Sequence, residues 1–439
     1  MSLLPQTAQR VDEIVARGQA AGRAPSLVAA VVRDGALAHF TGAGEQPHAD
    51  PKIQYRIGSI SKTMTATLVL QLRDEGRLTL DDLLYRHLPG TPVGSVTLRQ
   101  LLSHAAGLQR EPDGDWWERS AGVDLDGFLA RLTPDKLAHP PNHTYHYSNL
   151  AYGLLGAVLE RLTGERWVGL LGKRLLEPLG LRRTTYQPME PFARGYVVHP
   201  WHGTLREEPR YDARAMAPAG QLWSTAADMA TWATFLADPA PAVLAPGTLA
   251  EMCAPMMITD PEAWTGGYGL GIQSWRRGER IYVGHTGSMP GYLSVLMVHR
   301  ASRTGVVLFA NAYNLRGASM ASIGLDALTA VLDSEPSPPP APWRPGTQPP
   351  PDVAPLCGRW WWMGIEVEAA WDSGASSLVL TTRAGRGSTD VWRFDRESAD
   401  RWRCRSGSND GEIMTVQRDA AGVPSALDIA TFVFRRRPD

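Results

Sequence analysis

The sequence predicts a mixed α/β (α+β) domain, built on an antiparallel sheet flanked by helices, followed by a small antiparallel β domain. Three observations carry this prediction. Strand-like apolar runs stand at both ends of residues 1–332, and helical patterns fill the stretch between them. Residues 333–355 are rich in proline, and beyond them short alternating runs are separated by Gly, Asp and Ser turns. We therefore expect two folded parts joined by a linker.

The N-terminal elements are a helix, a hairpin and a second helix. Residues 8–22 have the apolar spacing of an amphipathic helix. An Asp-Gly turn joins two strand-like runs, Ser26–Arg33 and Ala36–Gly42. Ser59 then opens a helix whose apolar residues recur every four positions, and Gly76 supplies its stop.

The middle of the chain, residues 80–240, is expected to be mainly helical with long loops. Tyr152–Leu162 and Thr225–Leu236 have the clearest helical patterns. Strand patterns then return at Arg280–Val283, Leu293–His299 and Thr304–Ala310. A sheet that takes strands from both ends of the domain accounts for this order.

The linker and the small domain follow. Ten of the 23 residues from 333 to 355 are proline, which excludes a helix or an interior strand. The alternating runs after it are typical of a barrel-like, antiparallel domain: Ser377–Thr382, Val391–Phe394, Glu412–Gln417 and Leu427–Phe434. We place the first domain at residues 1–332, the linker at 333–355 and the small domain at 356–439.

Composition excludes several classes of partner. The net charge of −1 and the pI near 6.8 give no reason to expect nucleic acid or an anionic membrane. Three scattered cysteines without Cys-x-x-Cys spacing argue against a disulfide scaffold and favour a reducing compartment. The first twenty residues lack a signal-peptide pattern, and no run of about 18 apolar residues could span a bilayer. We expect a cytoplasmic protein without metal or cofactor.

Lysine usage draws attention to Lys62. The chain has 40 arginines but four lysines, and Lys62 lies three residues after Ser59 on the expected helix. Residues three apart on a helix share a face. A desolvated Lys can lose its proton whereas Arg cannot, so the pair fits a serine nucleophile with a proton acceptor or electrostatic activator beside it.

Two further clusters supply the remaining groups that acyl transfer requires. In Tyr147-Ser148-Asn149, Tyr147 is a second candidate base if a neighbouring cation lowers its pKa, and Asn149 can orient Lys62 or a substrate carbonyl. In His285-Thr286-Gly287-Ser288, we expect a turn at Gly287 that lets the backbone approach closely. The Ser288 N–H would then join the Ser59 N–H as an oxyanion hole, with Thr286 and Gly287 in contact with substrate.

Taken together, these motifs make the chain recognisable. Ser-x-x-Lys, Tyr-x-Asn and His-Thr-Gly occur in this order, and the stretches 76–82, 97–104 and 220–225 add to the match. The chain resembles the serine β-lactamase and penicillin-binding-protein superfamily, in particular its branch of class C β-lactamases, family VIII esterases and D-aminopeptidases. The resemblance covers about residues 8–332. It implies a transpeptidase-like fold in which Ser59 is acylated and the acyl group passes to water or another nucleophile.

The small domain carries a second, looser resemblance. Residues 356–439 are similar to the lipocalin-like appendage of D-aminopeptidases and of penicillin-binding-protein-type thioesterases, which release and macrocyclise nonribosomal peptides. The resemblance leaves two roles open, a cytosolic esterase or D-aminopeptidase and a stand-alone peptidyl thioesterase. The expected partner is a small ester, thioester or peptide, and an acyl or peptidyl carrier protein for the second role.

One departure from the family pattern narrows the range of expected substrates. Position 285 is His where β-lactamases and cell-wall peptidases usually have Lys. A neutral imidazole pairs poorly with a substrate carboxylate, which argues against penicillin and for esters, thioesters or peptides. We expect His285 to contact the oxyanion or the substrate. The alternatives are β-lactamase or D,D-carboxypeptidase activity and, in another class, an inactive relative that acts as a binding or sensor module.

Overall fold

The computed structural model describes residues 2–44, 50–335, 342–382 and 390–438. The chain divides into two units, Met1–Pro336 and Ser337–Asp439. Each unit has a hydrophobic core of its own.

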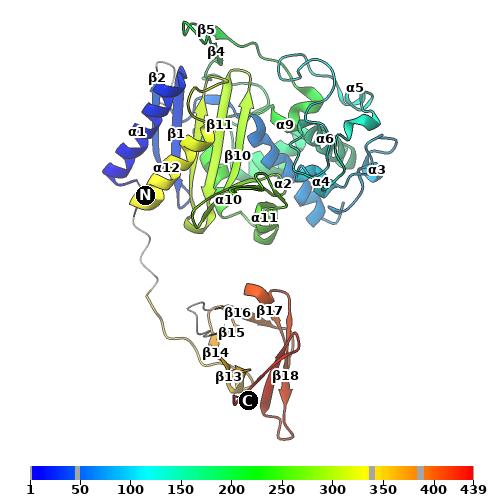
Figure 1. Ribbon diagram of the computed structural model, residues 1–439, viewed down its shortest axis with the longest axis vertical. Helices are drawn as coiled ribbons and strands as arrows, with labels where there is room; N and C mark the ends of the chain where they lie inside the picture. The colour runs from blue at the N-terminus through cyan, green and yellow to red at the C-terminus, as the bar shows by residue number, and fades with distance from the viewer. Residues whose placement is uncertain (1, 45–49, 336–341, 383–389, 439) are drawn as a thin grey trace. The chain divides into compact units, whose positions relative to one another are not determined.

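An antiparallel sheet organises the first unit, with the strand order β2-β1-β12-β11-β10-β9-β8-β7 among the described residues (Figure 1). The N-terminal hairpin lies beside the last strand of this sheet, because β1 pairs with β12 from Leu27 to Arg33. The predicted sheet with strands from both ends of the domain is therefore confirmed. Its strands are β1 (Ser26–Arg33), β2 (Ala36–Gly44), β7 (Met257–Ile258), β8 (Gly266–Tyr268), β9 (Gln273–Arg277), β10 (Arg280–Met289), β11 (Tyr292–His299) and β12 (Thr304–Ala310).

The sheet is buried on both faces, which explains why β1 reads as a continuous apolar run rather than an alternating one. Leu27, Ala29 and Val31 enter the core under α1 (Pro5–Gly22) and α12 (Met320–Ser334). The intervening residues, Val28, Ala30 and Val32, enter the larger core on the opposite face. Figure 1 shows α1 and α12 together on one face of the sheet.

The helices that carry the site pack on the other face. The first of them, α2, is preceded by a 3₁₀ turn at Gly58–Ile60, so the helix expected from Ser59 begins as a tighter coil. The expected helices at Tyr152–Leu162 and Thr225–Leu236 correspond to α6 and α10. The helices of this region are α2 (Ser61–Asp74), α3 (Leu84–His87), α4 (Leu98–Leu102), α5 (Leu125–Leu129), α6 (Asn149–Thr163), α7 (Trp167–Leu171), α8 (Glu177–Leu179), α9 (Ala217–Gly220), α10 (Ala226–Ala237) and α11 (Pro246–Cys253).

Two short ribbons complete the first unit. Strand β3 (Gln54–Arg56) pairs with β6 (Trp223–Thr225), and β4 (Tyr196–Val198) pairs with β5 (Leu205–Glu207). Among the described helices, none combines the length and the apolar character needed to cross a membrane.

The second unit is a closed antiparallel barrel of eight strands in its described part, which confirms the predicted lipocalin-like fold. Trp360 and Trp402 are fully buried in its core. The single run expected at Leu427–Phe434 is in fact two strands, because Ala430 and Thr431 adopt positive φ and form a hairpin turn. The barrel strands are β13 (Gly358–Trp362), β14 (Ile365–Asp372), β15 (Ser377–Thr382), β16 (Val391–Arg396), β17 (Arg401–Cys404), β18 (Ile413–Arg418), β19 (Pro424–Ile429) and β20 (Phe432–Arg435).

Candidate active site

Ser59 lies where the start of α2 meets strand β10, and two glycines make this contact possible. Gly58 has φ +52°, and a Cβ on it would lie 2.5 Å from the Ser288 nitrogen. A Cβ on Gly287 would lie 2.0 Å from the Ile57 carbonyl oxygen. Real Cβ atoms do not approach other atoms this closely, so only glycine fits at either position. The backbone before Ser59 is thereby held directly against β10.

Gly287 lies inside β10 and not in a turn, which corrects the expected end of this strand at Val283. The pairing of β10 with its two neighbouring strands explains how it can still present free backbone N–H groups. β11 pairs with β10 as far as Met289, whereas β9 pairs with it only as far as Gly284. The C-terminal half of β10 therefore has an open edge.

The backbone N–H of Ser288 lies on this open edge. Thr286 donates its N–H to Gln273 Oε1 (2.9 Å), so this group points away from β11. Backbone groups alternate with a period of two along a strand, and the Ser288 N–H must point the same way. It faces the edge against which Gly58 packs. This arrangement is compatible with the predicted oxyanion hole of Ser59 and Ser288, which stays a prediction.

Three oxygen atoms surround the Lys62 ammonium nitrogen. Lys62 Nζ lies 3.0 Å from Ser59 Oγ, 2.7 Å from Asn149 Oδ1 and 2.6 Å from the Ala219 carbonyl oxygen. The last two atoms can only accept hydrogen bonds. A neutral amine would use its two N–H groups on them and turn its lone pair toward the Ser59 hydroxyl.

The neutral form of Lys62 is accessible near neutral pH. Its side chain is fully buried, and burial is the main reason why its pKa falls to about 7. The nearby Arg110 cation lowers the pKa further, while Glu111 and Glu118 oppose the shift. A base with a pKa near the working pH is well suited to proton transfer.

Tyr147 also contacts Ser59, and its hydroxyl donates to Ser59 Oγ at 2.9 Å. Lys62 Nζ and the Arg110 guanidinium each lie 5.1 Å from the centre of its ring. These cations do not produce the lowered pKa that a base role would require, because burial raises the Tyr147 pKa well above 10. Tyr147 is a neutral phenol and hence a proton donor at Ser59.

Asn149 is fixed by a carboxylate that the sequence did not reveal. Its Nδ2 donates to both carboxylate oxygens of Glu111, at 2.8 and 3.1 Å, and this orients its Oδ1 toward Lys62. Trp117 Nε1 donates to the same carboxylate at 2.7 Å. Asn149 does not cap α6, since the cap is the Ser148 side chain, which accepts from the Ala151 N–H.

His285 does not take the predicted place against the substrate, and this prediction is corrected. Its side chain is fully buried, burial lowers its pKa to about 3, and it lies outside the cavity lining. One ring nitrogen contacts the carbonyl of Thr286, so the other accepts from the Tyr268 hydroxyl at 3.0 Å. His285 thus connects β10 to Tyr268, whose ring packs against the ring of Tyr147.

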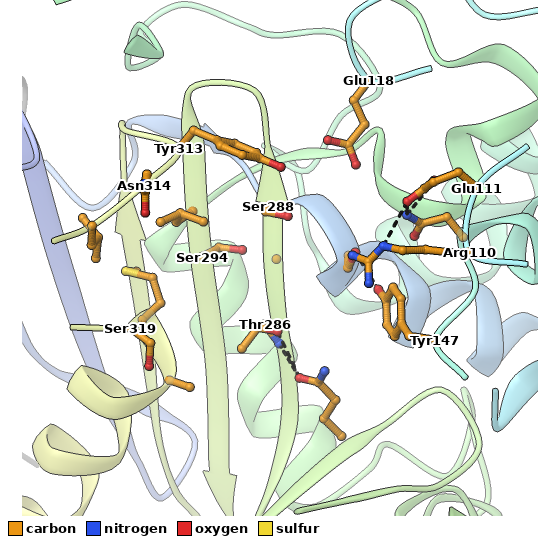
Figure 2. Close-up of a pocket in the computed structure, with 18 of the residues that line it drawn as sticks. Arg110, Glu111, Glu118, Tyr147, Thr286, Ser288, Ser294, Tyr313, Asn314 and Ser319 are labelled. Carbon is orange, nitrogen blue, oxygen red and sulfur yellow. Dashed lines mark hydrogen bonds and ion pairs between the residues drawn. The ribbon is translucent and has the colours of Figure 1, made fainter. Parts of the chain in front are cut away.

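A cavity of about 780 Å³ opens above Ser59 between β10, β11 and the loop that carries Arg110 and Glu111 (Figure 2). Of the predicted residues, Ser59, Tyr147, Asn149, Thr286, Gly287 and Ser288 line it. The lining also includes residues that no sequence motif indicated: Trp116, Glu118, Gln273, Leu293, Ser294 and Tyr313. The described residues contain no group of three or more His, Cys, Asp or Glu side chains arranged to hold a metal ion.

Comparison with known proteins agrees with this geometry. The sequence matches the Beta-lactamase family over residues 11–328 and a domain of unknown function over residues 349–436. It is 28% identical over 374 residues to the human putative beta-lactamase-like 1, which covers 78% of this chain and 73% of that protein. It is also 28% identical to beta-lactamase-like protein 2 of Dictyostelium discoideum, but the chain spans only 59% of the length of that relative.

The solved structures that resemble this one include the following two. A D-stereospecific amidohydrolase from Streptomyces has 26% identity and a TM-score of 0.65, over 73% of this chain and 98% of that chain. The crystal structure of SurE has 25% identity and a TM-score of 0.60, over 98% of this chain and 99% of that chain.

The chain belongs to the Beta-lactamase family, within the serine β-lactamase and penicillin-binding-protein superfamily. The resemblance stated from the motifs is confirmed. The fold that positions Ser59 is shared with a relative that is described as a D-stereospecific amidohydrolase.

Proposed function

We propose that this protein is a serine hydrolase that forms an acyl-enzyme on Ser59 from esters or amides, including those of D-amino acids. One observation carries the proposal. Ser59 Oγ lies within hydrogen-bond distance of both Lys62 Nζ and the Tyr147 hydroxyl, on the wall of a cavity large enough for a substrate.

In this proposal, each group has a defined step. Neutral Lys62 takes the Ser59 hydroxyl proton while Oγ bonds to the substrate carbonyl carbon. The oxyanion is stabilised by the backbone N–H groups of Ser59 and Ser288. The carbon–heteroatom bond then breaks, and Tyr147 donates its proton to the leaving oxygen or nitrogen, with Lys62 returning a proton to Tyr147. Water then attacks the acyl-enzyme carbonyl and loses a proton to Lys62. As the bond to Ser59 Oγ breaks, Lys62 gives this proton to Oγ, which restores the Ser59 hydroxyl and the neutral amine.

The substrate class rests on two supports. A relative with a similar structure is described as a D-stereospecific amidohydrolase, and SurE has been solved with D-Leu. In addition, the third motif contributes a buried neutral His285 instead of a cation, so this motif offers no charged partner to a substrate carboxylate. Both favour uncharged or amino-bearing esters and amides over penicillins.

Intact-mass spectrometry tests the proposal. After exposure to a fluorophosphonate or a p-nitrophenyl ester, we expect one covalent adduct, which peptide mapping places on Ser59. Ser59→Ala should form none. Equal labelling of this variant, or no labelling of the native protein, would favour an inactive binding module.

A second role differs only in the acceptor. The closed barrel of the second unit agrees with the resemblance of residues 356–439 to the appendage of penicillin-binding-protein-type thioesterases. This supports a peptidyl thioesterase that receives its acyl group from a carrier protein. A peptidyl N-acetylcysteamine thioester distinguishes the roles, because transfer to an amine gives a cyclic product and transfer to water gives the linear acid.

A further inference from the structure

Glu118 is a buried carboxylate in the cavity wall that the proposed chemistry does not use. Its exposed fraction is 8%, yet it is one of the residues that line the cavity with Ser59. Its Oε2 atom accepts no hydrogen bond from any described residue. Leaving a buried carboxylate oxygen without a donor is unfavourable, because the oxygen has lost its hydrogen bonds to water. An unpaired group of this kind in a cavity points to a partner supplied by the ligand.

The surroundings of Glu118 narrow the chemistry of that partner. No Lys or Arg of the described chain lies within ion-pair distance of it, and the nearby cation Arg110 is paired with Glu111 at 3.2 Å. Figure 2 shows the Glu118 carboxylate and the Tyr313 hydroxyl pointing toward one another across the cavity. Tyr313 and Trp116 form an edge-to-face pair with ring centres 6.0 Å apart, and both line the same cavity.

A carboxylate beside exposed aromatic rings is suited to an organic cation. The carboxylate supplies charge and hydrogen-bond acceptors, and aromatic faces attract ammonium groups. A substrate carboxylate would instead be repelled by Glu118.

We propose that Glu118, with Trp116 and Tyr313, forms a subsite for a free ammonium group on the acyl part of the substrate. This inference rests on the proposed function and names its substrate class as aminoacyl esters and amides. The subsite selects acyl groups with an unblocked amine, while Ser59 and Lys62 carry out the acyl transfer.

The charge on Glu118 changes within the physiological range. Burial, followed by repulsion from Glu111, raises the Glu118 pKa to about 7, and the cations around it oppose this shift. The charged and titratable groups that face Glu118 are Glu111, Lys62, Arg56, Arg110 and Tyr313. Because the ionised carboxylate binds the cation, affinity for an ammonium ligand should rise as the pH increases through 7.

Binding to the inactive Ser59→Ala variant isolates the subsite from turnover. The probe is phenethylammonium, an alkylammonium that stays protonated up to about pH 9, with neutral 2-phenylethanol as its matched control. We expect the Kd of the cation, measured by calorimetry, to fall about tenfold between pH 6 and pH 8, as the Glu118 carboxyl ionises. The alcohol should show no such change.

Lys62 also loses its proton near pH 7, so a further variant separates the two groups. Ser59→Ala with Glu118→Gln keeps Lys62 and measures its contribution alone. We expect this variant to bind phenethylammonium at least tenfold more weakly at pH 8, and Glu118→Asp to recover part of the affinity. A pH-independent Kd in the Ser59→Ala protein, or an unchanged Kd with Glu118→Gln, would overturn the subsite.

Kinetics test the same subsite in the active enzyme. The substrates are the p-nitrophenyl esters of D- and L-phenylalanine and of 3-phenylpropionic acid, which lacks the amine. Glu118→Gln should lower kcat/KM at least tenfold for a phenylalanine ester and leave the 3-phenylpropionate ester within twofold. An equal loss on both kinds of ester would show a merely structural role.

A charge-matched control and the adduct experiment complete the design. Glu251→Gln removes a carboxylate that pairs with Arg73 and Arg99 outside the cavity, and should leave both kinds of ester unaffected. If the subsite proposal is wrong, the Ser59 adduct still forms. If the proposed function is wrong, no adduct forms, and phenethylammonium binding still tests the subsite on its own.

Discussion

At the scale of single residues, the central feature is Lys62, whose pKa is lowered to about 7 by its surroundings. Asn149 Oδ1 and the Ala219 carbonyl occupy two directions around Lys62 Nζ, and Ser59 Oγ occupies the third. Burial disfavours the ammonium form, because a charge loses its hydration there. The same contacts would suit a charged lysine, so the pKa decides whether Lys62 is a base.

The pH dependence of acylation follows from this pKa. Lys62 must be unprotonated to accept the Ser59 proton, and its pKa of about 7 means that the reactive form is lost as the pH falls. For the neutral 3-phenylpropionate ester, we expect kcat/KM to fall about tenfold per unit below pH 7 and to level off above it. A stopped-flow profile of p-nitrophenol release checks this, and a rate that is flat from pH 5 to pH 8 would contradict it.

Lys62→Arg gives a complementary prediction. Arginine keeps the positive charge but does not lose its proton in a protein. We expect kcat/KM for the same ester to fall by about two to four orders of magnitude, the usual loss when a general base is removed. Undiminished turnover would show that Lys62 acts only as a charge, and circular dichroism checks that the variant is folded.

Glu111 is expected to act as a positioning residue through Asn149. Glu111→Gln should lower kcat/KM about tenfold, because an amide can turn its N–H groups toward Asn149 Nδ2 and misalign it. The loss of its negative charge should also move the inflection of the pH profile to lower pH, since Glu111 raises the Lys62 pKa. Asp113→Asn, on the same loop but paired with Lys136, is the control. A lower rate without the shift would indicate only a structural effect.

At the scale of elements, strand β10 and the 3₁₀ turn before α2 pack directly against each other. β10 leaves β9 after Gly284, and its open edge receives the backbone of Gly58. The contact positions Ser59 beside Ser288, because glycines replace the atoms that would keep the two backbones apart. The Ser294 hydroxyl of β11 adds a hydrogen bond to the Ile57 carbonyl at 2.8 Å.

Gly287→Ala should therefore damage the site more than the fold. The added Cβ would lie 2.0 Å from the Ile57 carbonyl and 2.3 Å from Ser294 Oγ, so β10 must move away from Ser59. We expect the free energy of unfolding to fall by about 1–3 kcal/mol and Ser59 labelling to slow by at least tenfold. Gly247→Ala, in α11 with no heavy atom within 4 Å of its Cβ, should change stability by about 1 kcal/mol or less. Unchanged labelling in Gly287→Ala would contradict the close contact.

At the scale of the whole molecule, all residues of the candidate site belong to the first unit. The residues that line the cavity lie between Ser59 and Ala321 in the sequence. The last helix of the first unit, α12, packs against the sheet. Its last described residue, Glu335, pairs with Arg33 and accepts from the Leu4 N–H. The barrel has a separate core around Trp360 and Trp402.

A chain that ends after Glu335 should consequently keep its reactive serine. We expect it to unfold cooperatively and to be labelled on Ser59 by a fluorophosphonate at a rate within about threefold of the full chain, since single domains unfold as units. A folded but unlabelled truncated protein would show that the barrel contributes to the site. The comparison also measures what the barrel adds, through the kcat/KM of each ester with and without it.

The sequence by itself determined the fold class and a cluster of four residues, the proposed nucleophile Ser59 and three neighbours. Periodicity identified the helices and strands because each element buries one or both faces, and Ser59, Lys62, Tyr147 and Asn149 lie together as their motifs indicated. These features depend on local spacing and on chemistry that few residue types can perform.

Only the tertiary structure decided the rest, because burial and the contacts between distant segments are not written in local spacing. His285 belongs to a family motif, yet its ring is buried against Tyr268 and does not line the cavity. Glu111 and Glu118 belong to no motif. Glu111 accepts from Asn149 at the start of α6, and Glu118 lines the cavity, so both positions depend on how their loop folds onto the domain. The pKa of Lys62 likewise depends on the exclusion of water around it, which only the packed structure sets.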